Sequence, residues 1–419
     1  MPPDTRRRTL FLVVVASLGY FVDIYDLVLF NVVKKESLEA LGLAGAELKR
    51  YDVQLFNWQM GGMLLGGLLW GILGDKKGRI TVLFGSILLY SLANLANAFV
   101  QGTDAYALCR VLAGIGLAGE LGAGITLVVE SMERAKRGWG TMAIVSFGAL
   151  GGVVARLVGG EGAAWAEALS WPLQGWQMAY VVGGILGLLL LVLRAGALES
   201  GLFKRVAGHA DVEKGSLRLL FSDRSRTIRF IGAVIIGLPI WYVVGVLINQ
   251  SDTIAAAVGV RGSVNVGDSV MWSYVGLSTG DLLSGALSQW LRSRRKVIFI
   301  YLVVLAGVVA VYLLRTGVSL AWFHFMCFAL GVGTGFWALF VTVASEQFGT
   351  NLRSTVTNLA PNLVRGCTIP LTLGFTALVP GIGAVGAAAL VGAVSLALSW
   401  LGTSLVQETF HKEMDFVER

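Results

Sequence analysis

The chain has 419 residues, of which 55% are hydrophobic and 14% are charged, and its formal net charge is +7. Soluble domains carry about 25% charged residues, so this composition excludes a soluble globular protein and indicates a chain that lies largely in lipid. The sequence has no G-x-x-x-x-G-K-(S/T) nucleotide loop, and its longest polar stretch is too short for a catalytic domain. Neither an enzyme nor an ATP-driven pump is therefore expected.

Apolar runs of about 20 residues, each long enough to cross a ~30 Å hydrocarbon core, recur along the chain. We expect an all-α membrane protein whose abundant glycines allow close helix packing. The polar stretch 194–227 separates six runs from six, which predicts an N-terminal six-helix bundle at 1–193, a linker, and a C-terminal six-helix bundle with a tail at 228–419. The twelve predicted transmembrane helices are 9–33, 53–73, 80–100, 105–129, 138–159, 176–193, 228–248, 266–286, 297–314, 319–343, 352–378 and 382–405.

Lysine and arginine gather on one side of the predicted helices. The side that holds both termini and the linker carries 24 of the 33 bases, and the opposite loops carry six. Because cytoplasmic loops hold the excess of bases, a multi-pass protein of the inner cell membrane with both termini in the cytoplasm is predicted. The net charge follows from this bias and requires no nucleic-acid partner. The three cysteines all fall in apolar segments, so no metal site, disulfide or cofactor is expected.

The first span carries two acids, Asp23 and Asp26, at depths of about 21 and 26 Å if each residue rises ~1.5 Å. They are three residues apart and therefore share one helical face. Ionisable groups at membrane depth are costly and usually functional, so both are candidates for binding a proton.

The short turn at residues 71–80 holds one acid and three bases between two apolar runs, so it must lie at a membrane face. Its residues Gly71, Asp75, Gly78 and Arg79 resemble the signature loop G-x-x-x-D-(R/K)-x-G-(R/K)-(R/K) of the major facilitator superfamily, with the last base missing. The resemblance implies a transporter with two six-helix halves. It also implies that Asp75 packs against the N-terminus of span 11 and holds the cytoplasmic side shut.

The fourth span opens with the pattern R-x-x-x-G-x-G at Arg110, and the first span holds Tyr-Asp at Asp26. Both segments resemble those of sugar-porter-like members of the same superfamily. The resemblance implies a pair between Asp26 and Arg110 that exchanges a proton as the transporter cycles, because an aspartate that loses its arginine in a dry site takes up a proton. The alternatives are a static ion pair between spans 1 and 4, and Asp23 as the proton carrier.

Glu120 lies near the middle of span 4, within a segment that resembles the G-G-E-W-G-G stretch of the metabolite:proton symporters. That branch carries dicarboxylates, tricarboxylates, shikimate, proline and betaines. Leu121 stands where the stretch has tryptophan. Glu120 is expected to bind a proton, to bind a cationic group, or to hydrogen-bond within the bundle.

The two halves of the chain echo one another. Glu130 and Arg137 lie seven residues apart after span 4, and Glu346 and Arg353 lie seven apart after span 10. A degraded copy of the signature loop follows span 8, with Gln289 in place of the acid. Internal symmetry of this kind marks transporter repeats, whose substrate sites lie near the midplane between the halves. We assign these four charged residues, with the signature loop, to gating at the cytoplasmic face.

Span 11 carries Asn358, Asn362 and Arg365 on one helical stripe, at i, i+4 and i+7. An arginine at membrane depth requires an anion, and a substrate carboxylate would match its two-pronged guanidinium. The alternative is pairing across the cavity with Asp23 or Glu120. The stripe is therefore the predicted substrate site.

Three further residues are assigned to the same site. Arg156 lies near the outer end of span 5, Trp241 in span 7 and Trp337 in span 10. Aromatic stripes are more often helix packing or interface belts than ligand platforms, so the two tryptophans also have a purely structural interpretation.

These features together predict a secondary active transporter that moves a small polar, anionic organic solute by proton-coupled symport. The same proton chemistry would serve an antiport exporter of drugs or metabolites. Two further alternatives are a sugar porter, which would need fewer charged residues within the membrane than this chain has, and a transporter-like sensor. Such a sensor would keep the fold but would not transport the solute. We expect a monomer whose partners are the solute, protons and the lipid bilayer.

Overall fold

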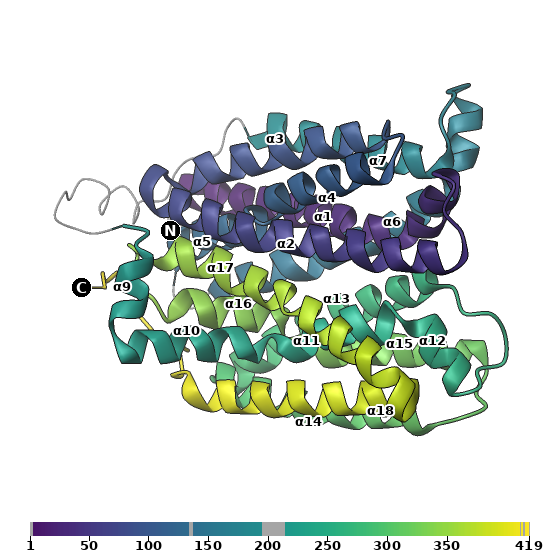
Figure 1. Cartoon of the computed structure of the whole chain (residues 1–419). Helices are drawn as coiled ribbons and strands as arrows, with labels where there is room; N and C mark the ends of the chain where they lie inside the picture. The colour runs from purple at the N-terminus through teal and green to yellow at the C-terminus, as the bar shows by residue number, and fades with distance from the viewer. Residues whose placement is uncertain (1–2, 134–136, 195–213, 411, 414, 419) are drawn as a thin grey trace.

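The computed structural model describes residues 3–133, 137–194, 214–410, 412–413 and 415–418, and these residues are almost entirely helical (Figure 1). Within them no β-strand forms, and one isolated bridge joins Arg261 to Ser319. The all-α class is therefore confirmed. The described helices are α1 (Pro3–Ala40), α2 (Gly45–Lys77), α3 (Arg79–Asn97), α4 (Thr103–Leu117), α5 (Glu120–Ser131), α6 (Arg137–Ala168), α7 (Gly175–Leu193), α9 (Leu217–Ser222), α10 (Arg224–Ile236), α11 (Leu238–Tyr242), the π-helix η3 (Val243–Ile248), α12 (Ser251–Ala257), α13 (Val266–Leu291), α14 (Arg294–Leu314), α15 (Leu320–Thr334), α16 (Trp337–Glu346), α17 (Arg353–Gly366) and α18 (Thr368–Leu405).

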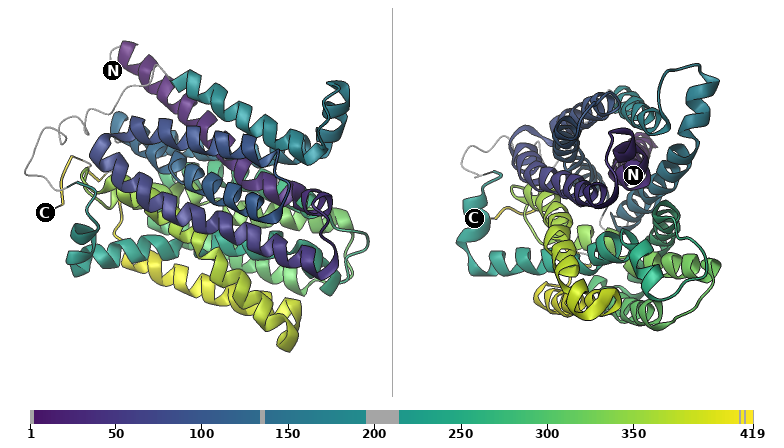
Figure 2. Two further views of the ribbon diagram at one scale, coloured as in Figure 1. Left: turned by 45° about the horizontal axis from the view of Figure 1, so that its top comes forward. Right: turned by 45° about the vertical axis from the view of Figure 1, so that its right-hand side comes forward.

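The helices form two groups that lie side by side (Figure 2). In the first group, α1 packs on α6, α2 on α4 and α3 on α7; in the second, α13 packs on α15 and α10 on α18. The groups meet along α2 with α17 and along α6 with α13. The limits of the two bundles stay a prediction, because residues 195–213, most of the expected linker, lie outside the described part of the chain.

Length and hydropathy mark most of these helices as membrane-spanning. Nine helical stretches within the described residues are long and apolar enough to cross a bilayer. One of them, Arg353–Leu405, runs for 53 residues, which at ~1.5 Å per residue is well beyond one ~30 Å crossing. Its backbone leaves helical geometry at Gly383, where φ is 71°. The count of twelve crossings stays a prediction.

The outer surface of the bundle is apolar, and the charged groups of the spans lie inside it. Leu65, Leu69, Leu92 and Leu108 are each more than half exposed, as expected for side chains that face lipid. The carboxylates and guanidinium groups of the predicted proton site are fully buried. Because hydrocarbon offers no hydrogen-bond partners, the charged side chains turn toward the interior, where other helices supply them.

Four predicted spans are interrupted rather than continuous. The fourth breaks between α4 and α5, the seventh passes into η3, the tenth breaks between α15 and α16, and the eleventh breaks between α17 and α18. Two of these breaks place a predicted site residue at a helix start: Glu120 begins α5 and Trp337 begins α16. Irregular backbone at membrane depth is tolerated where it is buried in protein, and both positions are buried.

Both chain ends lie at one end of the helices (Figure 1), which we call the termini-bearing end; the other is the opposite end. An even number of crossings requires this arrangement. The placement of the termini in the cytoplasm stays a prediction.

Candidate functional site

Arg365, on α17, lies at the centre of the molecule between two tryptophans. Its guanidinium carbon is 5.7 Å from the ring centroids of both Trp241 and Trp337. Its Nη2 lies 3.6 Å from Asp23 Oδ2 on α1, an ion pair too long for a hydrogen bond. The structure thus brings together four residues that the sequence had placed on four different spans.

The two asparagines of the α17 stripe hold the helices together beside Arg365. Asn362 Nδ2 donates to the carbonyl oxygen of Ala118, at the break between α4 and α5, at 2.9 Å. It also donates to Asn358 O at 2.7 Å, and Asn362 Oδ1 accepts from Arg365 Nη1 at 3.4 Å. Asn358 Nδ2 donates to Ser354 O at 2.9 Å. The predicted shared face is present, and both amides also fix the contact between the two helix groups.

Asp26 and Arg110 are both fully buried, but no ion pair within 4.0 Å joins them. Arg110 donates instead to Asn94 Oδ1 at 2.8 Å and to Asn97 Oδ1 at 3.3 Å, and its guanidinium lies 4.6 Å from the centroid of the Tyr180 ring. Neither oxygen of Asp26 accepts a hydrogen bond of normal geometry from the described residues. Asp26 is therefore a buried acid that no hydrogen bond from Arg110 holds in place.

Glu120 forms an ion pair that the sequence did not reveal. Both of its oxygens bind Arg194, one through an Arg194 Nη1 contact of 2.8 Å. Arg194 Nη2 also donates to the carbonyl oxygen of Val15. The sequence assigned Arg194 to the linker, yet its side chain is only 1% exposed. Three roles were considered for Glu120, and the contact observed is with a cation within the bundle. The sequence around an arginine at the end of a span does not indicate whether its side chain folds inward.

At the opposite end, two contacts join the helix groups. Arg156 Nε donates to Asp268 Oδ1, on α13 in the second helix group, at 2.8 Å. The guanidinium that the sequence assigned to substrate binding is therefore paired with an aspartate in this structure. Lys34 Nζ lies 3.0 Å from Asp52 Oδ1 and donates to Asn249 Oδ1 at 3.2 Å. We call the pairs Lys34–Asn249 and Arg156–Asp268 the outer links. Lys34 lay just beyond the predicted first span and was not identified from the sequence.

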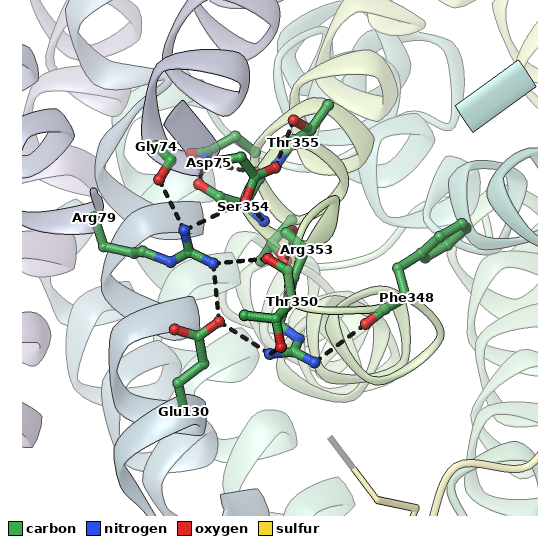
Figure 3. Close-up of polar contacts among 11 residues, drawn as sticks. Gly74, Asp75, Arg79, Glu130, Phe348, Thr350, Arg353, Ser354 and Thr355 are labelled. Atoms are coloured by element: carbon green, nitrogen blue, oxygen red, sulfur yellow. Dashed lines mark hydrogen bonds and ion pairs between the residues drawn. The ribbon is translucent and has the colours of Figure 1, made fainter. Parts of the chain in front are cut away.

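At the termini-bearing end, Asp75 caps the first turn of α17 (Figure 3). Its carboxylate accepts from the backbone amides of Ser354 at 3.1 Å and Thr355 at 2.8 Å, and from Thr355 Oγ1 at 2.7 Å. Amides at a helix N-terminus have no partner within the helix and favour an anion. A Cβ on Gly71, one turn earlier, would lie 2.9 Å from Thr355 Cα, which explains the glycine. The packing of Asp75 implied by the family resemblance is therefore present.

Arg79 and Glu130 extend this contact between the helix groups (Figure 3). Arg79 Nη2 donates to Glu130 Oε1 at 2.9 Å, and the same oxygen accepts from Arg353 Nη1 at 2.9 Å. Arg79 Nη1 donates to Gly74 O at 2.8 Å across the turn. Gly78 has φ 105°, a conformation that favours glycine, and this turn directs Arg79 into the network.

The internal repeat of the sequence is also present in the ion pairs of the structure. Arg294 donates from Nε and Nη2 to the two oxygens of Glu346 at 2.9 and 3.0 Å, so Arg294 stands to Glu346 as Arg79 stands to Glu130. Arg137 Nε donates to the carbonyl oxygen of Val129 at 3.1 Å. Each glutamate therefore binds the arginine at the start of the helix that precedes its own span.

The segment after α18 also contacts the termini-bearing end of the helices. Glu408 accepts from Ser293 Oγ at 2.5 Å and from the backbone amide of Arg294 at 3.0 Å. Partial burial would raise the pKa of Glu408, but these hydrogen bonds hold that pKa below its ordinary value. Phe416 O accepts from the amide of Thr350 at 2.8 Å. These tail contacts were not predicted from the sequence.

Links between the two helix groups are thus present at both ends, and Arg365 and Asp23 between them are at most 1% exposed. The centre of the molecule thus holds an enclosed cation and an enclosed acid between two sets of contacts that join the helix groups.

The Asp75 contact gives a direct prediction. In Asp75→Asn the side chain keeps one acceptor oxygen and loses its charge, and each hydrogen bond to a charged group contributes about 1.5–3 kcal/mol. We expect the transport rate to fall about tenfold or more, with a normal gel-filtration profile and helical content. Asp104→Asn, at an exposed acid in the first turn of α4, is the matched control. Uptake by Asp75→Asn at the rate of this control would rule out a gating role.

Comparisons with known proteins bear on the whole chain. The family model described as Major Facilitator Superfamily matches residues 16–364. A probable 4-methylmuconolactone transporter of Cupriavidus pinatubonensis is 26% identical over 93% of this chain and 89% of its own length. The 3-(3-hydroxy-phenyl)propionate transporter of Escherichia coli is 30% identical over 74% of this chain and 76% of its own. The structure of the proton:xylose symporter XylE, bound to 6-bromo-6-deoxy-D-glucose, superposes with a TM-score of 0.76 at 15% identity and covers 98% of both chains.

Proposed function

This chain belongs to the Major Facilitator Superfamily and is a multi-pass membrane transporter of small metabolites, and from this premise we propose that it carries a small organic anion together with protons. The termini-bearing end faces the cytoplasm of a cell whose inner membrane holds the protein as a monomer. The solute site is the space around Arg365, and the proton site is Asp26. Asp75, Arg79, Glu130 and Arg353 close the cytoplasmic gate.

The main observation in favour of an anionic solute is the environment of the Arg365 side chain. It is buried, flanked by two indole rings, and its Nε and Nη2 donate no hydrogen bond to the described residues. Asp23, its ion-pair partner, likewise accepts none of normal geometry. A carboxylate in this space would take two parallel hydrogen bonds from the guanidinium, and Trp337 Nε1, also without a partner among the described residues, supplies a further donor.

The relatives support an organic acid as the solute. The E. coli relative is named for 3-(3-hydroxy-phenyl)propionate, a carboxylate at neutral pH, and the Cupriavidus relative for 4-methylmuconolactone. Symport follows from charge: a carboxylate that enters with at least one proton does not have to work against the membrane potential. An exporter working by proton antiport is the second candidate, because Asp26 could serve either direction.

The test uses purified protein in liposomes with a pH-sensitive dye and no imposed gradient. Adding 3-(3-hydroxyphenyl)propionate or 4-methylmuconolactone outside should make the external solution more alkaline as labelled solute enters, and a protonophore should abolish this pH change. External acidification would identify an antiporter. A response to D-xylose and to neither acid would identify a sugar porter and contradict the anion. Binding without any flux would identify a sensor.

A further inference from the structure

Asp281, on α13, is a buried acid without a counter-charge. Its side chain is 0% exposed, and its Oδ1 accepts from the backbone amide of Ala338, in the first turn of α16, at 2.9 Å. Its Oδ2 has no hydrogen-bond partner among the described residues, and none of their lysine, arginine or histidine nitrogens lies within 4.0 Å of the carboxylate. A buried charge is costly unless a cation pairs with it or a proton neutralises it.

Asp75 also meets the first turn of a helix, and its charge is compensated far better. Its carboxylate accepts three hydrogen bonds and lies 3.4 Å from Arg79 Nη1. Asp281 accepts one hydrogen bond of normal geometry and has no such cation. Hydrogen bonds and a nearby cation stabilise the charged form of an acid. Asp281 therefore lacks what stabilises the charge of Asp75, and its free Oδ2 is the position where a proton can bind.

The charged and titratable groups on the helices around Asp281 either have partners already or do not titrate near neutral pH. Asp23 pairs with Arg365, and Glu346 pairs with Arg294. Arginines stay charged and phenols titrate at about pH 10. The middle of α6, the second half of α15 and all of η3 carry no charged residue. The groups around Asp281 are thus Tyr20 and Asp23 on α1, Arg294 and Tyr301 on α14, Glu346 on α16 and Arg365 on α17.

A short chain of contacts connects Asp281 to the proposed solute site. The amide of Ala338 binds the carboxylate, and the preceding residue, Trp337, places its ring centroid 5.7 Å from the guanidinium carbon of Arg365. The contact is close because Gly335 has no side chain: a Cβ there would lie 2.5 Å from the amide nitrogen of Asp281. A negative charge on Asp281 therefore opposes the binding of an anion at Arg365, and a proton on Asp281 removes this opposition.

Asp281 also lies on the face of α13 that packs against the first helix group. Three residues before it, Ser278 Oγ donates to the carbonyl oxygen of Ser146, on α6, at 2.7 Å. Four residues after it, a Cβ on Gly285 would lie 2.5 Å from Met142 Sδ, also on α6. Residues three and four apart share a helical face, so separation of α6 from α13 would uncover Asp281. A proton can then reach the acid or leave it during the transport cycle.

We propose that Asp281 binds a proton together with the anionic solute and is a second coupling site beside Asp26. This proposal rests on the proposed binding of an anion at Arg365. A proton from solution bonds to Oδ2 and turns the carboxylate into a neutral acid; no other bond forms or breaks, and Oδ1 keeps its hydrogen bond from Ala338. Because linked binding is reciprocal, the proton tightens anion binding and the anion tightens proton binding by the same factor.

The test counts the protons that accompany solute binding. Isothermal titration calorimetry of purified protein with 3-(3-hydroxyphenyl)propionate, at one pH in buffers of different ionisation enthalpy, gives the number of protons taken up per solute bound. In Asp281→Asn, whose amide has the shape of the neutral acid but gains no proton, we expect a smaller number. At alkaline pH this variant should bind the solute about tenfold more tightly than the wild type, whereas damage to the site would weaken binding.

Two further variants serve as checks. Asp281→Ser is a second neutral side chain with an oxygen that can accept from Ala338, and it should lose the same proton. Tyr301→Phe removes the hydrogen bond from Tyr301 Oη to Gly280 O, 2.9 Å long and on the same turn of α13, but removes no charge, so it should keep the wild-type proton number. In liposomes, the ratio of protons to labelled solute entering should be lower in Asp281→Asn than in the wild type.

The outcomes separate the second proton site from the function on which it rests. Solute binding with the wild-type proton number in both Asp281 variants overturns the second site and leaves the anion at Arg365 in place. Weaker binding with an unchanged proton number shows that Asp281 only caps α16, and an equal loss of protons in Tyr301→Phe shows an effect of packing; either result overturns the proposal. Absence of binding to the wild type contradicts the proposed function and the second site with it.

Discussion

Asp26→Asn is expected to abolish uphill accumulation of solute while exchange of bound solute across the membrane continues. Asparagine has the shape of a protonated aspartate but cannot lose the proton, so the step that releases protons inside is blocked. Exchange of one solute molecule for another needs no proton release and should continue within about twofold of the wild type, a difference of ~0.4 kcal/mol. The measurement compares proton-driven accumulation with counterflow in the same liposomes.

Two neighbouring acids serve as comparisons for Asp26. Asp23→Asn frees Arg365 from its ion-pair partner and should alter solute affinity more than coupling. Glu120→Gln leaves the buried Arg194 without its charge partner, and breaking such a pair costs about 3–5 kcal/mol, so its main effect should be a lower thermal stability. If Asp26→Asn still accumulates solute, the variant that loses accumulation and keeps counterflow identifies the carrier.

Arg365→Ala is expected to abolish binding of the acid that drives proton uptake, because the only cation paired with Asp23 at the centre of the described structure disappears. Arg365→Lys keeps the charge but loses the planar fork, and its affinity should fall about tenfold or more, ~1.4 kcal/mol. Isothermal titration calorimetry on purified protein measures both. Asp23→Asn should act in the opposite direction and tighten binding, because the solute no longer competes with an internal carboxylate.

A folding control is needed, since Arg365→Ala leaves Asp23 buried without a counter-charge, which is strongly destabilising. The double variant Arg365→Ala, Asp23→Asn removes both charges and should recover stability without recovering binding. Unchanged affinity in this double variant would show that Arg365 is structural and would remove the main support for an anionic solute.

Several features were predictable from sequence because each depends on residues that are close together in the chain. Membrane helices follow from local hydropathy, since each must satisfy its own backbone hydrogen bonds in lipid. The turn at Gly78 follows from its glycine and the surrounding charges. The position of Asp75 on α17 came from family resemblance, and the structure contains the contact.

The ion-pair partner of each buried charge was not predictable from the sequence, and the internal repeat of the two halves shows why. Its symmetry places Glu130 and Glu346 at matching positions, but does not say that Glu130 also binds Arg353, 223 residues away. That contact exists because α5, which carries Glu130, packs against α17, which begins at Arg353. Arg156 is similar: its depth was estimated from sequence, but its partner Asp268 depends on how α6 meets α13.

The sequence by itself thus determined the class of protein, the orientation signal in its bases, and which charged residues lie at membrane depth. Only the tertiary structure decided that Arg194 turns inward to Glu120, that Arg365 faces Asp23 between two indoles, and that Arg110 lies over the Tyr180 ring. The physical reason is that a transmembrane helix is apolar on most of its faces, so its hydropathy pattern scarcely indicates which neighbour it packs against. A buried charge must be compensated, but the helix that compensates it is chosen by packing alone.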